Sequence, residues 1–388
     1  MILQHPLFNL GFRPFFLLAG AVATLLIPLW LAIFAGLWPA PTYLGFMGWH
    51  THEMLFGYTM AVVAGFLLTA VSNWTGIITA TGPLLAGLAV LWVAARITLT
   101  FNVGLPAWLV AMIDVSFLPA LAGVLFLPLW RSGNFRNLIF PALLLALVVA
   151  NLVIHLQAQG VLASGNLLAQ QFALNAVMLM MVVIGGRVIP FFATSVLPDA
   201  QIRRIDWADK AAIGLVMLVL VIDLFPLLSA LVGPAAILAA AINIVRMWHW
   251  RFLATLRIPM LWILYAGYGW VIVALVLKGL AGVVPLITPS TAIHALTVGA
   301  IGSLTLGMMS RVALAHTGRA IVASTPIIAA FIFINLSAIL RVVIPIVMPG
   351  FYWSGLVISG LLWAVAFALF VIYYTPILIQ PRIDGKPG

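Results

Sequence analysis

Two histidines, a glutamate and a methionine stand together at the start of a hydrophobic segment of this chain. They are His50, His52, Glu53 and Met54, and Glu53 is the only glutamate in the sequence. Imidazole, carboxylate and thioether groups bind metals, and histidine also transfers protons near neutral pH. Ionisable side chains are costly near lipid, so their presence in an apolar segment indicates a function. Metal ligation is the chemistry that this set favours.

The composition indicates that this segment belongs to a membrane protein. Hydrophobic residues make up 65% of the 388 residues and charged residues only 6%, whereas soluble domains are about 45–50% apolar. The first apolar segment has no signal-peptide cleavage pattern. The chain has no cysteine, so its own ligands for a metal are restricted to His, Met and carboxylates. The net charge of +10 comes from scattered arginines, which is typical of membrane-protein loops and does not indicate nucleic-acid binding.

Twelve segments are apolar and long enough to cross a bilayer, which takes about 20 residues each. The sequence therefore predicts an all-α polytopic membrane protein with a single transmembrane domain over residues 1–388. The predicted spans are at about 15–37, 50–72, 83–101, 106–129, 138–158, 166–190, 211–231, 233–249, 259–281, 290–310, 325–346 and 353–376. Connections with Lys and Arg mostly alternate with uncharged ones, and cytoplasmic loops collect Lys and Arg. We therefore expect both termini in the cytoplasm.

This topology places four of the seven histidines near the outer surface. His50 and His52 open the second span, His155 ends the fifth and His294 opens the tenth. The remaining histidines fall on the cytoplasmic side, and they are His5, His249 and His316. Metal or haem ligation by the outer set is favoured over four unrelated hydrogen-bonded histidines.

Helix geometry separates the two histidines of the second span. His50, Glu53 and Met54 share one helix face, whereas His52 points away from His50. One metal bound by both histidines would need a non-helical first turn. Otherwise the two histidines serve different centres.

Five charged residues within or near the spans leave alternatives open. Arg96 and Asp114 predict either a structural ion pair between neighbouring helices or a proton relay. Arg13, Arg187 and Arg311 lie near cytoplasmic helix ends, where arginine usually reaches the headgroups. Contact with an anionic group such as a haem propionate is the other interpretation.

The tenth span contains small residues at a spacing of four, namely Gly299, Ser303 and Gly307. This face permits either close helix packing or a flat porphyrin lying against it. Glycines also follow His52 and His294 at the same two offsets, which hints at an internal repeat and at three four-helix units. Chance similarity between apolar segments is the alternative.

Several motifs resemble the NnrS family, in the same order from residue 11 to about residue 319. They are Gly11–Phe16 (GFRPFF), Trp49–Gly57 (WHTHEMLFG), Gly65–Val71 (GFLLTAV), Asn73–Gly76 (NWTG), Gly185–Pro190 (GGRVIP), Thr255–Pro259 (TLRIP) and the block from His294 to Arg319.

The resemblance implies a bacterial inner-membrane protein that contains haem b and copper. It implies a role in nitric oxide metabolism and in defence against nitrosative stress, with nitric oxide as the partner. An enzyme is favoured, namely a nitric-oxide-converting oxidoreductase such as a nitric oxide reductase. The alternatives are a transporter or channel for a metal or small anion, and a sensor or scavenger that binds nitric oxide without turnover.

The assignment of ligands rests on the depth of the histidines and not on a ligand set taken from the family. We expect one of His50 and His52, together with His294, to bind haem, and His155 with the remaining histidine to lie near copper. Met54 suits Cu(I) as a further ligand.

Two further expectations concern proton transfer and architecture. Glu53 would pass protons or orient an imidazole, which makes it the candidate catalytic residue. The arrangement also resembles that of haem–copper oxidases, which have twelve spans in three arcs and histidines on spans two and ten. Their copper-binding histidines on spans six and seven are not present in this sequence, so this analogy concerns the fold alone.

Overall fold

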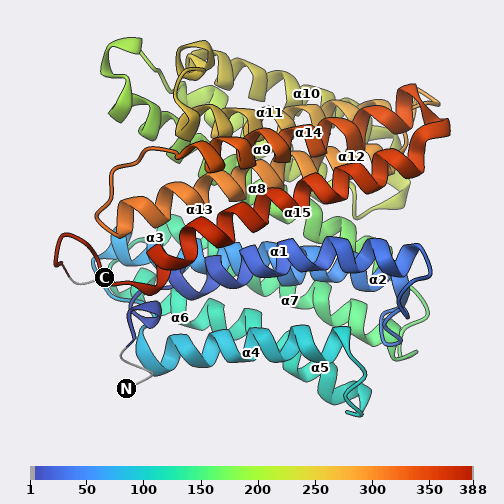
Figure 1. Ribbon diagram of the computed structural model, residues 1–388. Helices are drawn as coiled ribbons and strands as arrows, with labels where there is room; N and C mark the ends of the chain where they lie inside the picture. The colour runs from blue at the N-terminus through green and yellow to red at the C-terminus, as the bar shows by residue number, and fades with distance from the viewer. Residues whose placement is uncertain (1–4, 387–388) are drawn as a thin grey trace. The chain divides into compact units, whose positions relative to one another are not determined.

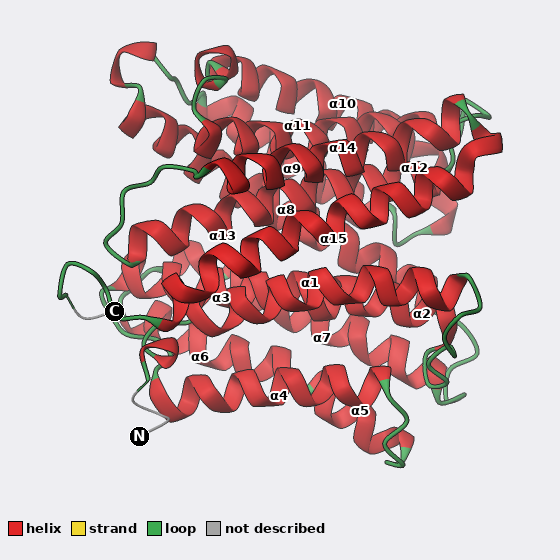
Figure 2. Ribbon diagram, viewed as in Figure 1, coloured by secondary structure: helices red, strands yellow, loops and turns green. Residues whose placement is uncertain are grey.

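The computed structural model describes residues 5–386, which form helices and no strand (Figure 2). Three α segments continue from the one before, so these residues make twelve long helices, as the all-α prediction requires. Eleven of the twelve are long and apolar enough to cross a bilayer. These eleven are Phe12–Phe34, Gly45–Thr75, Gly82–Thr100, Ala107–Arg131, Phe135–Ala158, Asn166–Val196, Pro226–His249, Pro259–Leu280, Pro289–His316, Thr325–Val347 and Pro349–Ile379.

The twelfth helix, α9 (Asp206–Ile222), is shorter than the sequence predicts. It has 17 residues, about 26 Å at 1.5 Å per residue, slightly less than a typical hydrocarbon core. The predicted seventh span at 211–231 was wrong at its end. Pro226–Leu228 forms a 3-10 turn that starts the next helix, and α10 (Ser229–His249) continues through Pro234. Pro226 is tolerated as the first residue of this turn because its missing N–H would have no helical partner there.

Contacts divide the chain into two compact units. The first unit comprises residues 1–173, 312–320 and 370–388, and the second comprises residues 174–311 and 321–369. Three helices contribute residues to both, namely α8 (Asn166–Val196), α13 (Gly302–His316) and α15 (Tyr352–Ile379). The expected single transmembrane domain and the three four-helix units stay predictions.

The first unit is built on the N-terminal helices. They are α1 (Phe12–Phe34), α2 (Gly45–His52), the π-helical segment η3 (Glu53–Thr59), α3 (Met60–Thr75), α4 (Gly82–Thr100), α5 (Ala107–Val115), α6 (Phe117–Arg131) and α7 (Ile139–Ala158). The beginnings of α2 and α5 lie at the same end of this unit as the ends of α4 and α7 (Figure 1). This end is the one that the loop charges assign to the outside.

At the opposite end of the first unit, the start of α1 contacts the end of α15. Arg13, at the start of α1, donates through Nη1 to the carbonyls of Leu378 (2.8 Å) and Gln380 (2.7 Å) at the end of α15. Arg382 donates to the carbonyl of His316 at the end of α13 (2.9 Å). The start of the first helix and the end of the last helix therefore lie on one side, which an even number of crossings, the eleven spans together with α9, requires. The assignment of that side to the cytoplasm stays a prediction.

The aromatic motif at the start of α1 packs on the glycine of α3. A Cβ at Gly65 would lie 2.8 Å from the ring of Phe16 and 3.1 Å from Cβ of Phe15. The N–H of Phe12 donates to the hydroxyl of Thr69 (3.1 Å). These aromatic side chains are fully buried. Only a residue without a side chain lets the two helices approach this closely.

The second unit is built on helices of the C-terminal half. Besides α9 and α10 they are α11 (Pro259–Leu280), α12 (Pro289–His294), the π-helical segment η8 (Ala295–Ile301) and α14 (Thr325–Val347). A Cβ at Gly299 would lie 2.5 Å from the Trp270 ring, and one at Gly307 would lie 2.9 Å from Ile263. Both neighbours belong to α11. Of the two expectations for this small-residue face, close helix packing is therefore the one that the structure shows.

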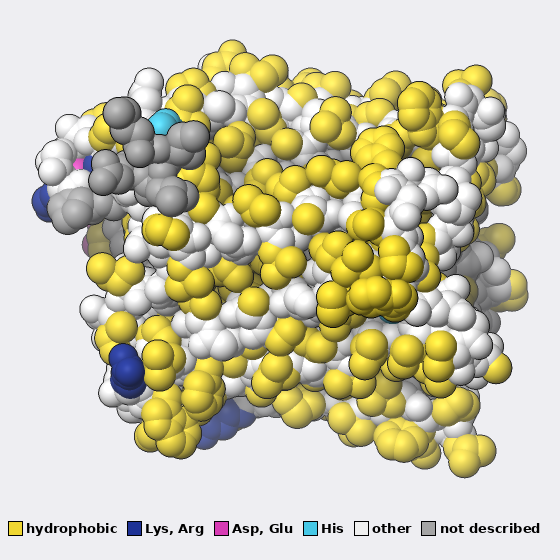
Figure 3. Space-filling model, turned by 90° about the horizontal axis from the view of Figure 1, so that it is seen from below, with side chains coloured by type: hydrophobic (Ala, Val, Ile, Leu, Met, Phe, Trp, Pro, Cys, Tyr) yellow, Lys and Arg dark blue, Asp and Glu magenta, His cyan; other side chains and the backbone are white. Residues whose placement is uncertain are grey.

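The surface is apolar in the way that lipid contact requires. The face in Figure 3 is covered mostly by hydrophobic side chains, and the Lys and Arg side chains in view lie towards one end. Among the exposed apolar residues, Leu25 and Val90 are each 67% accessible. Soluble proteins rarely expose continuous apolar surface of this extent.

Candidate metal centre

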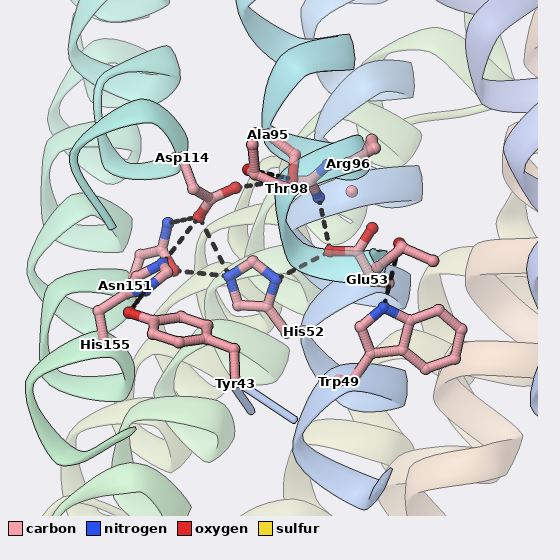
Figure 4. A network of polar contacts seen from close by, with 12 residues as sticks. Tyr43, Trp49, His52, Glu53, Ala95, Arg96, Thr98, Asp114, Asn151 and His155 are labelled. Carbon is pink, nitrogen blue, oxygen red and sulfur yellow. Dashed lines mark hydrogen bonds and ion pairs between the residues drawn. The ribbon is translucent and has the colours of Figure 1, made fainter. Parts of the chain in front are cut away.

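A polar group lies buried where four helices meet at the predicted outer end of the first unit (Figure 4). His52 ends α2, Arg96 precedes the end of α4 by one turn, Asp114 lies at the end of α5 and His155 lies in the last turn of α7. Each is within about 5–10 Å of the nearest end of its span, at 1.5 Å per residue. None of the four is more than 8% exposed. The sequence-based depth argument thus placed His52 and His155 correctly at one level.

A π-helical segment follows His52 directly. It runs from Glu53 to Thr59, and the hydroxyl of Thr59 donates to the carbonyl of Met54 (2.7 Å). Short π-helical segments are rare and occur frequently at functional sites. This one carries Glu53 at its first position, next to the buried imidazole.

Acceptor oxygens surround the ring of His52. Its Nδ1 lies 3.2 Å from Oε1 of Glu53, and its Nε2 lies 2.8 Å from Oδ1 of Asn151 and 3.2 Å from Oδ2 of Asp114. The amide of Asn151 donates to Asp114 (2.6 Å), which fixes its oxygen towards His52. Since both ring nitrogens face acceptors, both carry a proton in this arrangement. His52 is then a buried cation.

Asp114 is the common partner of the group. Its Oδ2 lies 3.1 Å from Nε2 of His155, and its Oδ1 forms an ion pair with Arg96. The ion pair, one of the two expectations for these charges, is therefore present. One donor atom from each of His52, Asp114 and His155 lies within 4.8 Å of the other two. Donors bonded to one metal at about 2.1 Å in a tetrahedral site are about 3.4 Å apart, so this group can bind a single metal ion.

The outer nitrogens of both imidazoles are held by side chains. Glu53 contacts Nδ1 of His52. Nδ1 of His155 lies 2.9 Å from the hydroxyl of Tyr43, which accepts from the amide of Gln159 (3.1 Å). Burial raises the pKa of the Tyr43 hydroxyl above its ordinary value, so it stays protonated at neutral pH. Metal-binding histidines almost always have such a partner on the second nitrogen.

Glu53 has one oxygen engaged and one without a partner. Its Oε1 lies 3.2 Å from Nη1 of Arg96, while its Oε2 is buried and accepts no hydrogen bond within residues 5–386. Gly57 makes room here, because a Cβ at this position would lie 2.6 Å from Arg96 and 3.3 Å from Oε2. An unsatisfied buried oxygen costs free energy. It is therefore suited to receive a proton or a hydrogen bond from a bound molecule.

The formal charges of the buried group cancel. Glu53 and Asp114 contribute two negative charges, and Arg96 and the doubly protonated His52 contribute two positive ones. Burial of an unbalanced charge at this depth would be costly. Any ligand that changes the total charge must therefore exchange with a proton or bring a counter-charge.

His50 faces a different environment from His52. Its ring stacks on Trp30, with centroids 4.4 Å apart, and Trp30 lies parallel to Phe46. His50 is half-buried, as is Met54 in the π-helical segment. The two histidines therefore point in different directions, as helical geometry predicts. Their roles as ligands, and that of Met54, stay predictions.

His294 lies in the second unit, at the end of α12. Its Nδ1 lies 2.7 Å from the carbonyl of Ser290, and its Nε2 lies 3.2 Å from Nη2 of Arg341. Ligation of iron through Nε2 would require the contact with Arg341 to break. The role of His294 as a haem ligand stays a prediction.

The three arginines proposed to contact an anionic group are not equivalent. Arg13 is fully buried and bonded to backbone carbonyls, and Arg187 is half-buried in α8. Arg311 is 4% exposed, and its guanidinium carbon lies 4.0 Å from the ring centroid of Phe192. Arg13 and Arg311 are covered by protein, so the simple headgroup interpretation does not describe them. Their contact with a haem propionate stays a prediction.

Two members of the site were missed or undervalued in the sequence. The sequence predicts for Asp114 an ion pair with Arg96 or a part in a proton relay, and not metal ligation, although Asp114 lies as many residues from the outer end of its span as His52 does. That equal depth was the available signal. Tyr43 lies in a connection with no charged residue, and no pattern in the sequence distinguishes it.

Similarity to known proteins identifies the family. No curated protein matches the chain. The family model described as NnrS protein matches residues 6–382. This match includes every residue of the buried group and extends beyond the motifs on both sides, to residues 6 and 382. Over nearly its whole length, the chain therefore belongs to the NnrS protein family.

Proposed function

We propose that this membrane protein binds nitric oxide at a copper-containing centre, with His52, Asp114 and His155 as the copper ligands. The NnrS family is associated with nitric oxide metabolism, which supplies the substrate. The observation that carries the proposal is the convergence of two buried imidazoles on one carboxylate. The second nitrogens of both imidazoles are already held by Glu53 and Tyr43.

Charge balance favours copper in its reduced form. Exchange of the proton on Nε2 of His52 for Cu(I) leaves the total charge of the buried group unchanged. A divalent ion would add a charge that no neighbouring residue offsets. Imidazole suits copper, and the thioether of Met54, two residues beyond His52, is a soft donor that selects Cu(I).

Assignment of His52 to copper leaves His50 as the haem ligand expected from this pair of histidines. A half-buried imidazole that stacks on Trp30, which in turn stacks on Phe46, is a suitable setting for an apolar porphyrin. His294 stays a candidate haem ligand, and Arg13, Arg187 and Arg311 stay candidate propionate contacts, on the sequence argument alone. Ligation through Nε2 of His294 would replace its contact with Arg341. Haem iron and copper would supply binding sites for nitric oxide and a store of electrons.

The protein's own groups would handle protons at this centre. Hydrogen bonds and ion pairs run from Tyr43 through His155, Asp114 and His52 to Glu53. The unpartnered Oε2 of Glu53 can hold a proton beside the bound molecule. Reduction of two nitric oxide molecules to nitrous oxide and water takes two electrons and two protons. The proposed enzyme is therefore a nitric-oxide-converting oxidoreductase of the bacterial inner membrane.

Metal counts and spectra of histidine variants test the ligand assignment. Protein purified from iron- and copper-replete cells should carry copper and show a haem Soret band. We expect His52→Ala, His155→Ala and Asp114→Asn to lose copper, and His50→Ala to lose haem while it keeps copper. His5→Ala changes an exposed histidine and serves as the control. Full copper in all three copper-ligand variants would overturn the assignment.

Turnover is tested separately from binding. Purified protein with nitric oxide and an added reductant should release nitrous oxide into the headspace, and Glu53→Gln should slow this release. A spectral change on nitric oxide binding without nitrous oxide would instead assign the protein as a sensor or scavenger.

A further inference from the structure

Arg341 is a buried cation near the end of α14 in the second unit. It is only 8% exposed. Its Nη2 donates to Nε2 of His294 (3.2 Å) and lies 3.4 Å from the hydroxyl of Tyr352. His294 accepts at Nε2, so its remaining proton is on Nδ1, which donates to the carbonyl of Ser290 (2.7 Å). Both partners of the guanidinium are therefore neutral.

None of the four carboxylates of the second unit forms an ion pair with this arginine. Asp209 pairs with Arg204 and Arg246, and Asp223 pairs with Lys278. The other two carboxylates of the unit, Asp199 and Asp206, lie before and at the start of α9, which is its cytoplasmic end in the predicted topology. Within residues 5–386, no ion pair joins Arg341 to an acid.

A buried guanidinium without a counter-ion is unfavourable. It presents parallel N–H groups that match two oxygens of a phosphate, nitrate or nitrite. The hydroxyl of Tyr352 lies beside these groups as a further donor. We propose that Arg341 and Tyr352 form a binding site for a phosphate or nitrogen oxyanion, with His294 holding the guanidinium in place. The proposal does not rest on the copper centre, which uses none of these residues. It excludes iron ligation by Nε2 of His294, because that ligation would break the contact with Arg341.

The position of the site gives the oxyanion two sources. Phe351, Tyr352 and Trp353 are 64%, 41% and 44% exposed around the start of α15. Exposed aromatic side chains at a helix end are typical of the membrane–water interface. The oxyanion is therefore either the phosphate of a phospholipid or a free small anion from the aqueous phase, and the chemistry of recognition is the same.

Titration of purified, delipidated protein tests the free-anion source. Sodium nitrite, nitrate and phosphate are added at constant ionic strength, with sodium chloride as the reference, and the thermal unfolding temperature is followed. We expect a saturable rise in the wild type and a loss of affinity of about tenfold or more in Arg341→Gln. Arg341→Lys should fall between them, because an ammonium keeps the charge but cannot bind two oxygens in parallel.

Mass spectrometry of the purified protein before lipid removal tests the phospholipid source. A phospholipid that accompanies the wild type and is absent from Arg341→Gln supports the site with a lipid occupant. Arg203→Gln makes the same change in charge at an exposed position of the same unit, and it should match the wild type in both measurements.

Two outcomes overturn the proposal. One is equal anion response and equal lipid content in the wild type and both Arg341 variants, each verified as folded by size-exclusion chromatography. The other is loss of haem alone in these variants. Should Arg341→Gln fail to fold, Arg341→Lys carries both comparisons, since it keeps the positive charge.

Discussion

Two histidines in different units of this protein each stand directly before a π-helical segment of seven residues. His52 precedes Glu53–Thr59 in the first unit, and His294 precedes Ala295–Ile301 in the second. The two regions therefore share the glycine spacing after the histidine and also the type of backbone segment. The surroundings differ in charge, because two carboxylates lie near His52 whereas Arg341 contacts His294. The same local backbone therefore presents a histidine to two carboxylates in one unit and to an arginine in the other.

The glycine at the fifth position after each histidine shows the same contrast. Gly57 leaves room for the charged side chains of Arg96 and Glu53, whereas Gly299 leaves room for the ring of Trp270. The first glycine serves a polar group, and the second serves apolar helix packing.

Removal of Asp114 should have the largest effect. Asp114→Ala leaves Arg96 and His52 buried without their shared carboxylate, which should cost about 3–5 kcal/mol of stability and abolish copper binding. Chemical denaturation and metal analysis measure the two effects. In the double variant Arg96→Met/Asp114→Asn the charges again balance, so stability should recover while copper stays absent. Recovery of copper as well would show that Asp114 is not a ligand.

A smaller effect is expected at Glu53. Glu53→Gln removes the carboxylate that holds Nδ1 of His52, and loss of such a partner typically weakens metal affinity by about 10–100-fold. Competition with a copper chelator measures the affinity. His294→Ala should leave copper affinity unchanged, because its region has no carboxylate in contact. Equal losses of copper affinity in Glu53→Gln and His294→Ala would contradict the assignment of copper to the His52 region alone.

The paired glycines allow a direct comparison. Gly57→Ala and Gly299→Ala should each cost about 1–3 kcal/mol through overpacking. Only Gly57→Ala should also lower the copper content, since its new methyl group displaces Arg96. A drop in copper in Gly299→Ala, measured on folded protein, would contradict the assignment of Gly299 to packing alone.

The exposed pair between Arg382 and Asp384 should give the smallest effect. Hydrogen bonding to Arg382 lowers the pKa of Asp384 below its ordinary value. The stabilisation is therefore present above the ordinary pKa of the carboxyl and is lost as the pH falls towards the lowered value. Asp384→Asn should unfold slightly earlier than the wild type at neutral pH, and the difference should vanish in acid. If Asp384→Asn lost as much stability as Asp114→Ala, burial would not explain why the two ion pairs differ in strength.

Hydropathy and loop charge predicted the helices and the level of the outer histidines. Each span needs a fixed length of apolar residues, and loop charges orient the spans, so the common depth of His52 and His155 followed from counting. The contact of both with Asp114 did not follow, because spans that are apolar on every side do not reveal their rotation about the helix axis. The predicted end of the seventh span was also wrong, because apolar residues continue past Ile222, the last residue of α9, into the turn.

The π-helical segment after His52 also sets the phase of the helix on either side of it. A π turn holds more residues than an α turn, so side chains beyond it are rotated about the axis relative to those before it. Gly65 and Thr69 can thus keep their packing on α1 while His52 faces Asp114. The side chains before and after the π-helical segment thus face directions that one continuous α-helix would not combine. Deletion of a single residue between 53 and 59 would turn His52 by about 100° with respect to the rest of the span. The alignment of His52 with Asp114 and His155 therefore depends on the register of this one turn.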